Sequence, residues 1–194
     1  VLAALTRLRQ ICCHPSVFID NYTGGSGKME LLMEQLPGLL DAGHSVIIFS
    51  QFTSMLSIIA DTLYDNQIPF FYLSGATKTI DRKRYVEEFN QGSVKLFLIS
   101  LKAGGTGLNL TGADTVIHFD PWWNPAVENQ ATDRAYRIGQ KKKVNIIKYV
   151  MKDSIEEKIY ELQKRKKLLS DSVIEAEEIF VNQLTKEEIA GLFE

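Results

Sequence analysis

Five short apolar runs recur along this 194-residue chain, and they restrict the fold more than any other feature of the sequence. Most of them are continuous rather than alternating, as in strands that are covered on both faces. Segments with helical spacing lie between the first three runs, so strand and helix alternate, which predicts a parallel sheet with right-handed crossovers. The runs are SVIIFS (45–50), FFYLS (70–74), KLFLIS (95–100), DTVIHFD (114–120) and VNIIKYV (144–150).

Composition limits the class of protein. A hydrophobic content of 45% in 194 residues is enough for one substantial core. No apolar run approaches the length of a membrane span and the first residues lack a secretory signal pattern, so we expect an intracellular protein without a membrane partner. The only cysteines, Cys12 and Cys13, are neighbours, which fits a reducing compartment. They cannot converge with His14 on one ion, so we predict buried packing and no metal site.

Charge is distributed unevenly along the chain. The net charge is −2, yet residues 170–194 hold seven acidic residues and one basic residue, which leaves residues 1–169 mildly basic. A mildly basic body permits a surface that follows nucleic-acid phosphates but does not require one.

The stretch GGSGK (24–28) is superficially similar to a phosphate-binding loop. Such a loop needs a glycine at position 22 and a hydroxyl residue at position 29, where this chain has Tyr22 and Met29. No buried strand precedes the stretch either. We therefore interpret it as a linker followed by a helix, with Ser26 as the N-cap residue.

A glycine-rich loop, LKAGGTGLNL (101–110), follows the third apolar run. In a parallel sheet, ligands bind at the carboxyl ends of the strands, where this loop would lie. Glycines allow the backbone to approach a ligand closely and expose N–H groups, which suits the phosphate of a nucleotide or of a nucleic-acid strand. The alternative is a tight turn between strand and helix.

The segment ENQATDRAYRIGQ (128–140) carries two arginines on a predicted helix. Val127, Ala131, Ala135 and Ile138 form an apolar stripe that would face the sheet, and three polar side chains flank it: Gln130, Arg134 and Arg137. We place Glu128, Asn129, Thr132, Asp133 and Tyr136 on the outward side. Planar guanidinium groups held at the rim of a packed face suit phosphate oxygens. Pairing of Arg134 with Glu128 or Asp133 is the alternative.

Three further local predictions follow from capping patterns. Asn124-Pro125 opens a helix, with proline at the first helical position. Asp153 or Ser154 caps a long helix that runs to about Leu169, and Thr185 to Glu188 is typical of a capping box in the C-terminal tail. His118, within the fourth apolar run, is expected to pack in the core.

The run LISLKAGGTGLNLTGADTVIHFDPWWNPAVENQATDRAYRIGQ (98–140) resembles the motif V and motif VI region of the Swi/Snf-type ATPases, a branch of the helicase superfamily that translocates on double-stranded DNA. Other blocks agree in order, so the resemblance covers nearly the whole chain. They are LRQICCHP (8–15) and SGKMELL (26–32) at the entry to the second lobe, VIIFSQFT (46–53) as motif IV, LSGATKTIDRKRYVEEFN (73–90) after it, and IEEKIYELQKRK (155–166) as the brace helix.

The resemblance implies the fold and the domain organisation. It implies an α/β, RecA-like parallel sheet with helices on both faces and peripheral C-terminal helices. Residues 1–27 would form the lead-in helix and linker from a first lobe, residues 28–152 the helicase C-terminal lobe, and residues 153–194 the brace helix and helical tail.

The resemblance also implies a shared ATP site. The family binds ATP between two lobes, with Mg²⁺ held mainly by the first lobe, and the second lobe supplies arginine fingers. By position, Arg134 and Arg137 match the fingers and Gln130 matches the glutamine that opens motif VI. Gly105, Gly107 and Asn109 are the nucleotide-binding candidates of the glycine-rich loop.

For DNA, the resemblance implies contacts to the phosphates of the tracked strand. Such contacts are independent of base sequence. Trp123 matches a tryptophan near the minor groove, whereas Trp122 stands where relatives are often polar or small, and burial under the helix explains it equally well. The remaining matched residues are Ser50, Gln51, Thr53, Ser74, Gly75, Lys102 and Thr106.

The function that the resemblance implies is the second motor lobe of an ATP-dependent double-stranded DNA translocase. Its partners would be the DNA backbone, the first lobe of the same polypeptide and an unidentified protein cargo or regulator. We expect the isolated lobe to be inactive as an ATPase. The protein would be cytoplasmic if bacterial and nuclear if eukaryotic. The alternative is a DNA- or protein-binding module without an ATPase cycle.

Overall fold

A five-stranded parallel sheet forms the centre of the protein. The computed structural model describes residues 2–104, 107–122, 125–135, 143–169 and 185–193. The strands are β1 (Val46–Ser50), β2 (Phe71–Leu73), β3 (Leu96–Ser100), β4 (Thr115–His118) and β5 (Asn145–Lys148), so each predicted run contains one strand. No helix in the described ranges has both the length and the apolar character needed to cross a bilayer.

The strand order is β2-β3-β1-β4-β5, and every neighbouring pair is parallel. β1 lies in the middle, where Ile48 pairs with Leu98 of β3 and with Ile117 of β4. The two edge strands are less buried than the three central strands, and Ile146 of β5 is 46% exposed. The predicted parallel α/β architecture is therefore confirmed.

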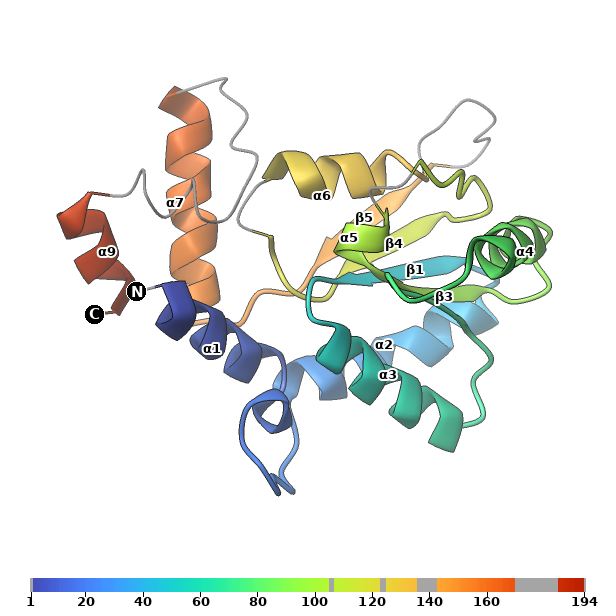
Figure 1. Ribbon diagram of the computed structural model, residues 1–194, viewed down its shortest axis with the longest axis horizontal. Helices are drawn as coiled ribbons and strands as arrows, with labels where there is room; N and C mark the ends of the chain where they lie inside the picture. Colours follow the sequence, from blue (N-terminus) through green and yellow to red (C-terminus); the bar gives the residue numbers. More distant parts are fainter. Residues whose placement is uncertain (1, 105–106, 123–124, 136–142, 170–184, 194) are drawn as a thin grey trace.

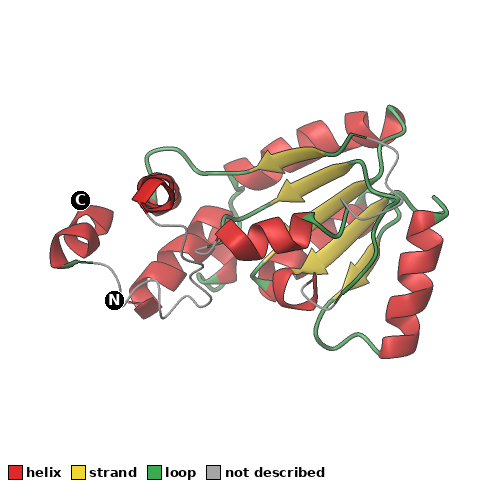
Figure 2. Cartoon of the chain, turned by 90° about the horizontal axis from the view of Figure 1, so that it is seen from above, coloured by secondary structure: helices red, strands yellow, loops and turns green. Residues whose placement is uncertain are grey.

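Helices cover both faces of the sheet (Figures 1 and 2). Side chains alternate along β1, so Ile48 packs on one face and Phe49 on the other. The face of Ile48 is covered by α2 (Gly27–Asp41) and α3 (Thr53–Asp65). The face of Phe49 is covered by three helices: α4 (Thr79–Asn90), α5 (Leu101–Gly104) and α6 (Pro125–Thr132).

A group of three helices lies beside the sheet: α1 (Leu2–Cys13), α7 (Ile155–Leu169) and α9 (Lys186–Phe193) (Figure 1). They share a small apolar cluster, in which Leu5 of α1 and Leu192 of α9 pack around Ile159 of α7. The 3₁₀ turn η1 (Pro15–Val17) links α1 to the segment before α2. The division of the chain at residues 27 and 152 stays a prediction.

The capping predictions have different outcomes. Thr185 and Glu188 form the expected capping box, because the backbone N–H of each donates to the side chain of the other at 2.8 and 3.1 Å. Ser154 accepts a bond from the N–H of Glu156 at 3.2 Å, as a cap should. Ser26 occupies the N-cap position of α2, but its hydroxyl donates to the carbonyl of Cys13 at 2.6 Å and caps nothing.

Candidate nucleotide and DNA interface

Several of the predicted site residues that the structure describes follow the carboxyl ends of strands. Gln51 comes after β1, Ser74 after β2 and Lys102 after β3. Because all strands are parallel, these ends lie at one edge of the sheet (Figure 2). Gly105, Thr106, Trp123 and Arg137 lie outside the described residues.

The turn after β2 is built by an arginine that the sequence pattern did not single out. Arg82, in the first turns of α4, donates through Nη2 to the carbonyls of Ser74 and Gly75 at 3.0 and 3.3 Å and through Nε to Thr77 at 2.9 Å. The N–H of Ser74 donates to the hydroxyl of Thr77 at 3.0 Å. These bonds fix the turn and leave Gly75 exposed.

The turn after β1 is fixed by a buried carboxylate. Asp120, two residues after β4, accepts bonds from the hydroxyl of Ser50 and, at 3.1 Å, from the N–H of Gln51. Burial raises the pKa of Asp120, and the bond from Ser50 opposes that rise. The Ser50 hydroxyl is thus already bonded inside the fold, whereas Thr53 at the start of α3 is exposed. The sequence does offer a signal for this role of Asp120: it is a carboxylate at the end of an apolar run, where a strand of the sheet ends.

The glycine-rich loop is anchored by the end of α4. Asn90 donates to the carbonyl of Asn109 and accepts from the N–H of Gly112, both at 2.8 Å. Gly112 must be glycine, since a Cβ there would lie 2.8 Å from the Cα of Asn90. Gly107 has a φ of +74° and open space around it, so conformation rather than crowding favours glycine there. Lys102 on α5 is exposed.

The arginine-bearing turn lies against this loop. The N–H of Leu110 donates to the carbonyl of Arg134 at 3.0 Å, which joins the two segments directly. Arg134 is only 8% exposed, and its Nε atom has no hydrogen-bond partner in the described parts of the chain. Asn109, which precedes Leu110, and Gln130, four residues before Arg134, are both exposed. The backbone thus places the segment of Asn109 beside that of Arg134, and their roles at a nucleotide site stay predictions.

The predicted helix over residues 128–140 needs correction. α6 ends at Thr132, and Ala131 and Ala135 are buried as expected. Glu128 and Thr132, which we expected to face outward, are buried at 2% and 5% exposure. The reason is tertiary: Glu128 binds Lys148 of β5 and accepts the N–H of Trp122 at 2.7 Å. Glu128 is therefore occupied by Lys148, which removes one of the two partners considered for Arg134.

Trp122 belongs to the fold rather than to an open surface. Its ring packs against the cluster on the α6 face of the sheet, and the indole Nε1 is buried without a hydrogen-bond partner among the described residues. Its carbonyl accepts from Nε2 of Gln163 at 2.6 Å, so α7 holds the same loop. Burial under the helix, one of the two accounts of Trp122, agrees with these contacts.

His118 packs in the core, as predicted. It is fully buried, stacks on Phe49 with ring centroids 5.6 Å apart, and its Nε2 lies 2.9 Å from the hydroxyl of Thr132. Burial lowers the pKa of His118 to about 4 from 6.5, and the nearby Lys148 contributes to the shift.

We predict that His118 makes folding sensitive to acid. The unfolded chain binds this proton below pH 6.5 and the folded chain only below about 4, so stability is complete above 6.5 and falls as the pH drops. Urea unfolding at pH 7.5 and 4.5 should show a loss about 2 kcal/mol larger for the wild type than for His118→Gln. Equal losses in both proteins would exclude His118 as the cause. A buried carboxylate with a raised pKa, such as Asp120, gains stability as the pH falls. Because Asp120 is present in both proteins, it does not account for the difference between them.

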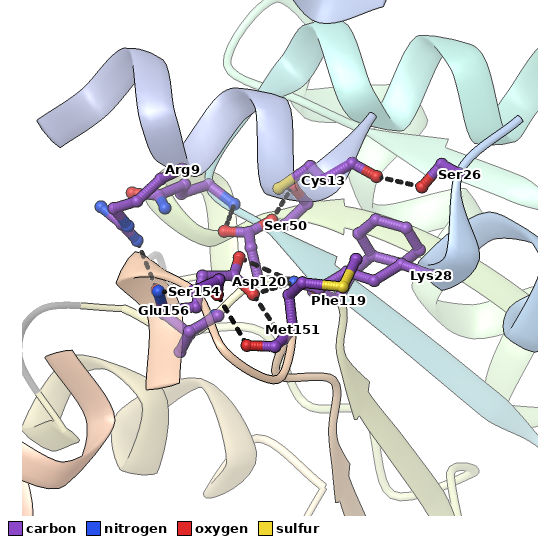
Figure 3. A network of polar contacts seen from close by, with 12 residues as sticks. Arg9, Cys13, Ser26, Lys28, Ser50, Phe119, Asp120, Met151, Ser154 and Glu156 are labelled. Atoms are coloured by element: carbon purple, nitrogen blue, oxygen red, sulfur yellow. Dashed lines mark hydrogen bonds and ion pairs between the residues drawn. The ribbon is translucent and has the colours of Figure 1, made fainter. Parts of the chain in front are cut away.

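Lys28, the lysine of GGSGK, is not available to a phosphate. Its Nζ lies 2.7 and 2.6 Å from the two carboxylate oxygens of Glu156 and donates to the carbonyl of Phe119 at 2.9 Å (Figure 3). The side chain is 3% exposed. The interpretation of GGSGK as a linker and helix start therefore agrees with the structure. Cys13 is also buried, and in the described part of the chain no three His, Cys, Asp or Glu side chains are arranged to hold a metal.

Comparison with known proteins identifies relatives along the whole chain. The family described as helicase conserved C-terminal domain matches residues 27–139. A curated relative, the putative ATP-dependent helicase/translocase YwqA of Bacillus subtilis, is 40% identical over 199 residues, covering 100% of this chain and 22% of that protein. The chromatin structure-remodeling complex subunit snf21 of Schizosaccharomyces pombe is 42% identical, covering 94% of this chain and 16% of that protein.

A solved structure shares the fold. The SWI2/SNF2 ATPase core of Sulfolobus solfataricus in complex with double-stranded DNA superposes with a TM-score of 0.82 at 35% identity, covering 98% of this chain and 41% of that one. The chain therefore spans about a fifth of the length of the curated relatives that it matches.

Proposed function

The chain belongs to the helicase C-terminal domain family, in its Swi2/Snf2 branch, and from this premise we propose that it is the second motor lobe of an ATP-dependent translocase on double-stranded DNA. In this proposal a first lobe, on the same polypeptide, binds the triphosphate, and the present lobe closes onto it. Alternating grip on DNA phosphates then converts closing and opening into steps along the duplex.

The bond between the N–H of Leu110 and the carbonyl of Arg134 is the observation that carries the proposal. It joins the glycine-rich loop to the arginine-bearing turn at the edge of the sheet where ligands of parallel α/β proteins bind. Arg134, with an Nε donor that lacks a partner among the described residues, is suited to an anion from outside this lobe. We propose Arg134 and Arg137 as fingers and Gln130 as a polar partner at the same site.

ATP with Mg²⁺ is the ligand that this site would share. The exposed Gly107 and Asn109, with Gly105, are the proposed contacts to nucleotide phosphates, and Mg²⁺ is assigned mainly to the first lobe. Bound ATP would supply the free energy of phosphoanhydride hydrolysis. The part of this chain would be to orient the triphosphate and to neutralise the negative charge on its outer phosphate.

DNA contacts are proposed along the same edge of the sheet. Gln51 and Thr53, the turn at Ser74 and Gly75, and Lys102 with Thr106 would meet successive phosphates, and Trp123 the minor groove. Hydroxyls, backbone amides and one lysine bind phosphates without selecting bases, so we propose binding that is independent of sequence. Ser50 is fully buried and its hydroxyl binds Asp120, so its proposed part is to help position Gln51 rather than to touch DNA.

The experiment that tests the proposal compares the isolated chain with the intact polypeptide. We expect the intact protein to hydrolyse ATP faster when double-stranded DNA is added, and the 194-residue chain alone to release no phosphate above background, because half of the pocket is absent. Phosphate release is measured with and without DNA. Turnover by the chain alone, abolished by substitution of Lys28, would refute the proposal in favour of a self-contained nucleotide site.

The same experiment separates the motor from the second candidate, a DNA- or protein-binding module. A module would bind DNA in the intact protein without any stimulated turnover. The relatives include a bacterial protein and a fission-yeast protein, so a cytoplasmic or nuclear location, according to the organism, stays a prediction.

A further inference from the structure

Four ionisable side chains are buried together where the sheet meets the helices beside it (Figure 3). They are Arg9 of α1, Lys28 of α2, Asp120 after β4 and Glu156 of α7, and none is more than 3% exposed. Two positive charges face two negative charges, so the group is balanced overall. The proposed grip on ATP and DNA uses none of the four directly.

The contacts of this network connect segments that are far apart in the sequence. Lys28 joins the carbonyl of Phe119, just after β4, to the carboxylate of Glu156 in the first turn of α7. Glu156 also accepts the N–H of Met151 at 3.0 Å, which fixes the chain between β5 and α7. Arg9 donates through Nη2 to the carbonyl of Pro121. The loop that follows β4 is thereby tied to both α1 and α7.

That loop also holds parts of the proposed DNA interface. Asp120 fixes Gln51 and Ser50, and the next residues, Pro121 and Trp122, lead to Trp123. Gln163 of α7 bonds the carbonyl of Trp122, which adds a second tie between the loop and the same helix. A displacement of α7 would therefore move the turn after β1 together with residues 119–122 after β4, which we call the tryptophan loop.

We propose that Lys28 is a positioning residue which, through Glu156, couples α7 to the tryptophan loop and so links ATP turnover to movement along DNA. This proposal rests on the proposed motor function. The pair holds the loop and the first turn of α7 as one unit, so that DNA grip changes when α7 moves. A pair that served stability alone would be replaceable by apolar side chains, because desolvation offsets much of the attraction between buried charges.

The test is the double variant Lys28→Met with Glu156→Met in the intact polypeptide. It removes both charges and leaves neither unpaired, which favours retained folding. Ile59→Val is the control, since Ile59 is fully buried in α3 and outside the network. Three quantities are measured for each protein: the urea midpoint of unfolding, DNA-stimulated ATP turnover, and the rate of translocation. The rate of translocation is read from release of the third strand of a DNA triplex.

The expected result is a stable double variant that still hydrolyses ATP on DNA but translocates about tenfold less per ATP consumed. Ile59→Val should keep the wild-type ratio. A double variant with the wild-type ratio overturns the proposal, as does one in which turnover itself is lost. If the double variant is less stable than the wild type, it is compared with Ile59→Ala, a variant destabilised to a similar extent. An equal fall in translocation per ATP in Ile59→Ala overturns the coupling role. A wild type without DNA-stimulated turnover would instead refute the motor function.

Discussion

Replacing Arg137 with alanine in the intact polypeptide is expected to lower DNA-stimulated ATP turnover by about 10³-fold or more and to leave DNA affinity unchanged, if Arg137 is the proposed finger. The reason is that an arginine finger neutralises charge that develops on the outer phosphate, an effect worth roughly 10³ to 10⁵ in rate. Steady-state phosphate release gives the turnover, and fluorescence anisotropy of a labelled duplex gives the affinity.

Arg84→Ala is the matched control for this experiment. Arg84 lies on α4, is 59% exposed at its side chain, forms ion pairs with Asp81 and Glu88, and lies over the ring of Tyr85. Removing it deletes one exposed arginine that has no proposed role in binding the nucleotide. Undiminished turnover in Arg137→Ala would contradict the finger assignment. Loss of DNA binding in that variant would show that Arg137 contacts DNA rather than ATP.

Replacing Glu156 with alanine should destabilise the chain by about 3–5 kcal/mol, the range expected when a buried ion pair loses one partner. The ammonium of Lys28 would still donate to the carbonyl of Phe119 but would lose the carboxylate of Glu156. Because Lys28 is 3% exposed, water could not replace that carboxylate. The N–H of Met151 would also lose its acceptor. Urea unfolding at neutral pH measures the change in the free energy of unfolding.

Glu161→Ala is the control for that variant, because Glu161 lies on the same helix and is exposed. It should shift the free energy of unfolding by less than about 0.5 kcal/mol. A similarly small shift for Glu156→Ala would mean that the folded chain rearranges around Lys28. The network in Figure 3 would then contribute little to stability.

The sheet could be predicted from the sequence because its signal is local. Runs such as 45–50 and 95–100 are apolar at every central position, which only strands covered on both faces require. The capping box at Thr185 and Glu188 is equally local, since both partners lie within one helical turn. The confirmed elements are those whose causes lie within a few residues.

What the sequence pattern missed depends on partners far along the chain. Lys28 and Glu156 are 128 residues apart, and no periodicity indicates that they meet. Glu128 is polar and was expected to face outward, yet Lys148 of β5 supplies a counter-charge that makes its burial possible. Fingers and DNA contacts were inferred from resemblance, and they stay predictions until ligands are tested.

The parallel sheet has a practical consequence for watching this protein at work. The predicted contacts at Gln51, Ser74 and Lys102 follow the carboxyl ends of β1, β2 and β3, whereas the loop before β3 lies at the opposite edge, with Gln91, Gly92 and Ser93 all exposed. Gly92 has a φ of +80°, which favours glycine, whereas Gln91 and Ser93 do not have a positive φ. A fluorophore attached through a cysteine at Gln91 would report motion of the lobe without obstructing the duplex.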